Sequence, residues 1–159
     1  MKQTKCLQPL RSMIIFVCLS VSIAFGLKAQ QPQLEKLSEE AVDQDGIDMA
    51  QELTENILDK MAEGSYYEFQ EGEAIPMLEQ QFTEQMQKQQ YQMIQSQLGA
   101  YEQGLEYQEA YQATQAGQEF TIYRFRAEFG QGQPEVRVVF TPDKQLAGLQ
   151  VMPWQEQMQ

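Results

Sequence analysis

Residues 136–154 read VRVVFTPDKQLAGLQVMPW: two apolar stretches joined by a polar turn and followed by the only tryptophan of the chain. Apolar and polar residues alternate in the first stretch and, around Gly148, in the second, a pattern typical of strands with one buried face. Pro142 and Asp143 are residue types that favour tight reversals. The stretch therefore predicts an antiparallel hairpin, with Gly148 at a bulge or a point of close packing.

The two-residue period extends back along the chain to about residue 105. Segments 105–114 and 119–129 alternate in the same way, and short, turn-rich connections join all four segments. Short connections favour antiparallel neighbours. Apolar residues hold one face of each strand and polar residues the other, as in a sheet that is covered on one side only. We expect a four-stranded antiparallel meander.

Helical periodicity dominates the chain before residue 105. Residues 45–64 carry apolar side chains at three- and four-residue steps, with Asp45 as a cap and Gly64 after the end. Pro76 is expected to open a short helical turn, and Thr83 to cap a longer helix that Gly99 ends. The order predicts an α+β fold in which N-terminal helices pack on a curved four-stranded meander sheet and leave a conical interior.

In the longer helix the apolar residues are expected to cover about half of the circumference. Phe82, Met86 and Met93 fall on one line, with Tyr91 and Ile94 on its flank. Its many glutamines are expected to form the solvated face.

The first 29 residues have the features of a secretory signal peptide. Lys2, Lys5 and Arg11 precede an uncharged apolar run at 13–27, and Ala29 offers a small residue for cleavage. A membrane anchor is the alternative, but it needs roughly 18 or more apolar residues. We therefore expect an exported protein, periplasmic or extracellular, with a flexible acidic leader at 30–45, one domain at 46–155 and a short tail at 156–159.

Charge and composition exclude several classes of function. Four of the 11 basic residues precede residue 30, so seven remain against 23 acidic residues, a formal net charge of −16. Such a chain repels nucleic acids and anionic membranes. It has no histidine, and both cysteines lie within the signal segment, so the usual zinc, copper and iron ligands are missing. A calcium loop around Asp43 and Asp45 is not expected either, because Gly46 comes two places too early for it. We therefore expect no metal, and we also expect no cofactor.

Three segments resemble an uncharacterised family of small secreted bacterial domains in the nuclear transport factor two-like, or cystatin-like cone, group. They are AQELTENILDKMAEGSYYEF, the helix ending QLGAY, and the closing VRVVFTPDKQLAGLQVMP, in which Ala147, Gly148, Leu149 and Pro153 match the family's typical ending. The resemblance covers roughly residues 45–154. It implies the cone fold, an exported location and often a role beside other domains such as α/β-hydrolases, and it implies no reaction.

Aromatic side chains are the candidate lining of a pocket inside the cone. Rings with a few hydroxyl groups suit an apolar ligand, although they also suit an ordinary core. The residues expected to line the pocket are Tyr91, Tyr107, Tyr123, Phe125 and Phe140.

Two functions remain open. One is a non-catalytic exported module that binds a small apolar ligand or a protein partner. Such a module could form a homodimer through the outer face of the sheet, where Arg124, Arg126 and Arg137 cluster. The other is a small cofactor-free enzyme, similar to an isomerase or dehydratase, with a buried carboxylate and tyrosines in the cone. Strand alternation puts Glu106 and Glu109 on opposite faces, so one of them could point inward.

Overall fold

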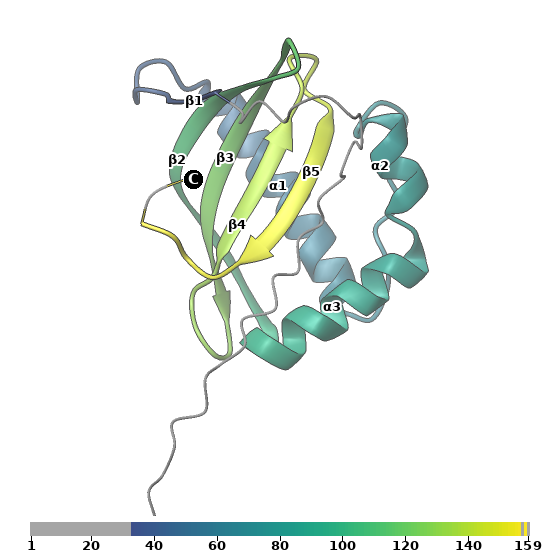
Figure 1. Cartoon of the computed structure of the whole chain (residues 1–159). Coiled ribbons are helices and arrows are strands. Elements are labelled where there is room, and N and C mark those ends of the chain that lie inside the picture. Colours follow the sequence, from purple (N-terminus) through teal and green to yellow (C-terminus); the bar gives the residue numbers. More distant parts are fainter. Residues whose placement is uncertain (1–32, 157, 159) are drawn as a thin grey trace, which may run out of the picture.

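The computed structural model describes residues 33–156 and residue 158, and contains three helices and five strands. The sheet is antiparallel throughout, with strand order β1-β2-β3-β4-β5, and helices lie on one side of it (Figure 1). The elements in chain order are β1 (Gln33–Lys36), α1 (Gln44–Ala62), α2 (Pro76–Gln81), α3 (Glu84–Leu98), β2 (Tyr101–Gln115), β3 (Gln118–Phe129), β4 (Glu135–Phe140) and β5 (Leu146–Met152).

The α+β class, with helices packed on an antiparallel sheet, is confirmed, but the expected strand count was wrong. The additional strand, β1, comes from the segment expected to be a flexible leader, and it pairs with residues 111–114 of β2. Its sequence, QLEK, is too short and too polar to show a clear alternation. Backbone pairing along the edge of β2 holds it. The expected signal segment lies outside the described residues.

Helix α1 begins at Gln44, one residue before the expected cap. Asp43 occupies the N-cap position, so Asp45 lies inside the first turn. The helix buries the expected stripe, which includes Ala50, Ile57 and Met61. Gly46 is also buried there, because α1 approaches Tyr123 so closely that a Cβ at Gly46 would lie 2.3 Å from the tyrosine oxygen.

Helices α2 and α3 have the predicted boundaries. Pro76 opens α2, the side chain of Thr83 accepts a hydrogen bond from the Met86 amide, and Gly99 ends α3 with a positive φ of 82°. The expected buried face of α3 was wrong in part. Met86 and Met93 are exposed, whereas Gln87 is fully buried.

Gln87 is buried because its carboxamide satisfies backbone groups of the preceding loop. Its oxygen accepts from the Tyr67 amide at 2.8 Å, and its Nε2 donates to the carbonyls of Tyr67 and Phe82. Helical periodicity shows which residues share a face, but it does not reveal that a polar side chain replaces solvent for a neighbouring loop.

The inner face of the sheet forms the core with the helices. Phe125, Val136 and Val138 are fully buried there. The outer face carries the charged residues, and a register shift between Tyr107 and Glu109 changes which residues it holds. Because one extra residue in β2 reverses the alternation, Glu109 pairs with Arg124 on the outer face instead of pointing inward.

Candidate functional site

An open groove runs between α1, the loop before α2 and the turn joining β4 to β5. Its volume is about 440 Å³. One face of α1 forms its main wall, because the lining residues of this helix recur at three- and four-residue steps. The lining residues are Asp45, Asp48, Met49, Glu52, Leu53, Asn56, Tyr67, Glu73, Phe140 and Lys144.

We call this feature the acidic groove. Leu53 and Phe140 are buried and contribute apolar surface, whereas four carboxylates and one ammonium group give the groove its charge. Lys144 pairs with Asp43 at 3.1 Å. Within residues 33–156, Asp45, Asp48 and Glu52 take part in no ion pair. The groove therefore combines a partly apolar lining with carboxylates that are open to a cationic group.

Tyr67 and Glu73 fix the wall opposite α1. The Tyr67 hydroxyl donates to the Glu73 carboxylate at 3.1 Å, and the same carboxylate accepts from the Gln70 amide at 2.7 Å. Burial, together with the negative charge of Glu73, raises the pKa of Tyr67 to about 12. The hydroxyl is protonated at neutral pH, as in any tyrosine, and donates the hydrogen bond that joins Tyr67 to Glu73.

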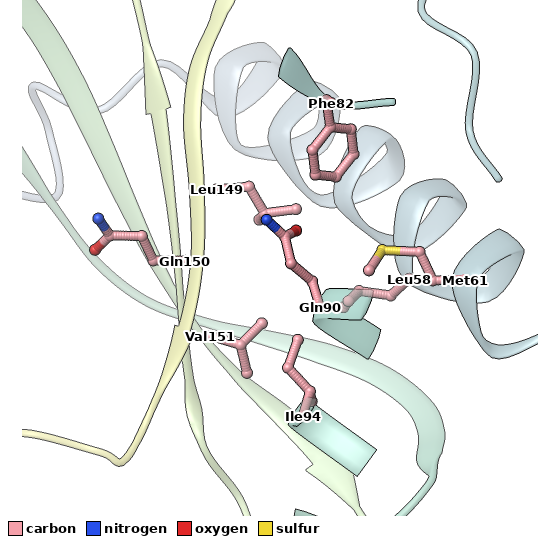
Figure 2. Close-up of a pocket in the computed structure, with 8 residues that line it drawn as sticks. All are labelled: Leu58, Met61, Phe82, Gln90, Ile94, Leu149, Gln150 and Val151. Atoms are coloured by element: carbon pink, nitrogen blue, oxygen red, sulfur yellow. The ribbon is translucent and has the colours of Figure 1, made fainter. Parts of the chain in front are cut away.

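A second, interior pocket lies between the sheet and helices α1 and α3 (Figure 2). Its lining includes Leu58 and Met61 of α1, Ile94 of α3 and Leu149 of β5, whereas the side chain of Gln150 points to the other side of its strand. Its volume is about 30 Å³, close to the share of one molecule in liquid water. Small-molecule sites usually occupy roughly 300–1,000 Å³, so this pocket is too small for a ligand.

The five aromatic residues expected to line a pocket mostly belong to the packed core. Tyr91, Tyr123, Phe125 and Phe140 are buried, and Tyr107 packs edge-on against Phe125 with ring centroids 6.0 Å apart. Phe140 lines the acidic groove, but the other four line neither the groove nor the interior pocket. The pocket that these residues were expected to line stays a prediction.

The outer face of the sheet was expected to be wet, but it carries a buried charge network. Arg124 and Glu135 are both fully buried. Arg124 binds Glu135 and Glu109, Arg137 binds Glu135, and Lys36 binds Glu109, so the network joins four strands. The predicted dimer face is thus largely engaged within the chain, and the homodimer stays a prediction.

The two carboxylates of this network lack the raised pKa that a general base in an apolar cavity would have. Burial alone would raise the pKa of Glu135, but hydrogen bonds from Arg124 and Arg137 outweigh burial and lower it. For Glu109, burial is likewise outweighed by hydrogen bonds with Lys36 and Tyr111, so its pKa is also lowered. Both groups lie on the outer face, away from the tyrosines that an enzyme in the cone would use.

The described residues contain no group of three or more acidic, histidine or cysteine side chains placed to hold a metal ion. No described helix has the length and apolar character needed to cross a membrane.

Comparison with known proteins places this chain in no family. No protein-family model, curated protein or solved structure matches it. The resemblance to secreted cone-fold domains therefore stays a prediction, and the acidic groove is the feature from which a function can be argued.

Proposed function

We propose that this protein is a non-catalytic exported module that binds a protein partner in the acidic groove, through a lysine or arginine side chain of that partner. The observation that carries the proposal is the pairing of Leu53 and Phe140 with Asp45, Asp48 and Glu52 along one groove. Lysine and arginine have apolar stems and charged ends. Their stems fit against the apolar lining while their ends meet the carboxylates.

Size and charge support a partner of this chemistry. The groove volume of about 440 Å³ lies within the usual range of binding sites. Without the first 29 residues the formal net charge is −16, and a field of that sign speeds the approach of a cationic partner. A protein partner is favoured over a small apolar ligand because the interior pocket is too small and the groove is charged.

The exported location and the cone shape are parts of the same proposal. The basic start, apolar run and small-residue exit of residues 1–29 support export. Helices laid across one face of an antiparallel meander support the cone shape. A cofactor-free enzyme is the less favoured alternative. It would need a buried carboxylate with a raised pKa, whereas Glu109 and Glu135, which form ion pairs on the outer face of the sheet, have lowered pKa values.

Binding of a labelled hexalysine peptide, followed by fluorescence anisotropy, tests the proposal. Glu52→Gln removes one groove carboxylate and should weaken binding by about fivefold, since about 1 kcal/mol is a typical contribution of such a contact. The matched control is Glu119→Gln, which makes the same change of charge at an exposed site on β3.

The control separates a site from general attraction to an acidic protein. We expect Glu119→Gln to change the affinity by less than about twofold, because an exposed charge outside the groove acts only through the screened field. Equal weakening by both variants, or no binding of hexalysine at 0.15 M salt, would contradict the proposal. A labelled hexaglutamate peptide should not bind.

A further inference from the structure

The C-terminal segment, residues 153–156, crosses the outer face of the sheet, on the side opposite α1 (Figure 1). Trp154 lies over two arginines of β3, with its ring centroid 4.0 Å from the guanidinium carbon of Arg126 and 4.6 Å from that of Arg124. Tryptophan is the most favourable ring for cation–π contacts, and arginine is the cation found most often in them. Arg124 and Arg126 therefore form a binding site for one aromatic ring on the outer face of the sheet.

Gln155 adds three hydrogen bonds at the next position of the chain. Its amide donates to Glu135 at 3.2 Å, its carbonyl accepts from Arg124, and its side-chain oxygen accepts from Arg137 at 3.1 Å. Two of these bonds use the backbone of the segment, and all three end on charged groups, which makes them stronger than bonds between neutral groups. The contacts recognise an extended chain with an aromatic residue followed by a hydrogen-bonding residue.

The side chains beneath the segment are held in place by ion pairs within the sheet. With the segment in place, Arg124 and Glu135 are fully buried. They also bind each other, Glu109 and Arg137, so bonds that do not involve the segment hold both side chains. Preorganised groups of this kind lose little freedom on binding. Tryptophan and arginine are also the residues that contribute most often to binding hot spots.

One contact of the segment is unsatisfied. The Nε1 atom of Trp154 is buried and has no hydrogen-bond partner among the described residues. A buried unpaired donor weakens the docking of the segment. This defect favours exchange of the segment over permanent attachment.

We propose that the outer face of the sheet is a peptide-binding site, filled within one molecule by residues 153–156 and, between molecules, by the same segment of a second copy. A second copy fits this site because its C-terminal segment carries the same Trp154 and Gln155 that the site already accepts. Exchange of an identical element is a low-energy route to association. Because a tethered segment has a high effective concentration, the site is occupied internally until the copies are concentrated.

A synthetic peptide of residues 151–159, labelled at its N-terminus, tests the site in trans. In the full chain with Trp154→Ala, no aromatic ring covers Arg124 and Arg126. This variant should bind the peptide saturably in an anisotropy titration. The wild-type chain should bind it at least about tenfold more weakly, because its own segment competes. Arg126→Glu in the Trp154→Ala background should abolish binding, whereas Lys60→Glu, on the exposed end of α1, should not affect it.

Three results would overturn the proposal: no binding by Trp154→Ala, equal binding by the wild type, or equal loss with Arg126→Glu and Lys60→Glu. Trp154 is the only tryptophan, so the unmodified chain gives a second readout that does not depend on the folding of that variant. Its emission should lie to the blue of that of the free peptide and shift towards it in Arg126→Ala. Emission equal to that of the free peptide would also contradict the proposal.

Discussion

Gly46 and Tyr123 meet where α1 approaches the sheet. A Cβ at Gly46 would lie 2.3 Å from the Tyr123 oxygen, far inside normal contact. Alanine in place of glycine within a helix normally stabilises it by about 1 kcal/mol. We expect Gly46→Ala to act in the opposite direction and to lower the free energy of unfolding by about 1–3 kcal/mol, measured by urea denaturation.

A double variant provides the control for this contact. Tyr123→Phe removes the hydroxyl oxygen that the new methyl group meets, so Gly46→Ala in the Tyr123→Phe background should cost much less than in the wild type. Interaction energies of about 0.5–3 kcal/mol are typical of residues in contact. Additive effects of the two changes would mean that α1 does not approach Tyr123 this closely.

Glu135 makes the stability of the fold dependent on acid. Burial alone would raise its pKa, but Arg124 and Arg137 lower it below the ordinary value of 4.5. As the pH falls, the unfolded chain therefore takes up a proton before the folded chain does. The stabilisation is complete above about pH 5 and is lost as the pH falls from about 4.5 through the pKa of the folded state.

Thermal unfolding between pH 7 and pH 3 checks this dependence. Glu135→Gln should lower the free energy of unfolding at pH 7 by about 3 kcal/mol, because it leaves buried arginines without their carboxylate, and it should flatten the decline in acid. Glu119→Gln, at an exposed position, should keep the wild-type profile. A profile for Glu135→Gln that parallels the wild type would contradict the network.

At the scale of elements, α3 holds the loop before α2 through one side chain. Gln87→Leu keeps most of the volume but leaves the Tyr67 amide and two carbonyl groups without their partner. We expect it to lower the free energy of unfolding by about 2 kcal/mol and to speed hydrogen exchange at the Tyr67 amide. Gln92→Leu, on the exposed face of α3, should do neither, and similar effects of both changes would contradict this role of Gln87.

The sequence predicted the elements better than it predicted their faces. The four strands β2 to β5 and all three helices were expected close to their observed positions, because periodicity and turn residues act locally. The extra residue of β2 between Tyr107 and Glu109 could not be foreseen, and it moves Glu109 to the outer face. Strand β1 was missed because its four polar residues gain their structure only from the edge of β2.

At the scale of the whole molecule, the acidic groove was not predictable. It joins α1 to Tyr67 and Glu73 in one loop and to Lys144 in a distant turn. Only the spacing of Asp45, Asp48 and Glu52 along one helix face was visible in the sequence. Composition likewise does not say whether the aromatic rings of the predicted pocket enclose a space or fill it.

On this proposal a cationic partner binds in the acidic groove. Amide chemical shifts of the isotope-labelled chain, recorded during titration with hexalysine, test it most directly. The claim predicts saturable shifts in residues 45–56, at Tyr67 and Glu73 and in the turn around Lys144, with little change in β3 and β4 around Arg124. Shifts spread over all acidic surfaces, or concentrated away from the groove, would contradict it.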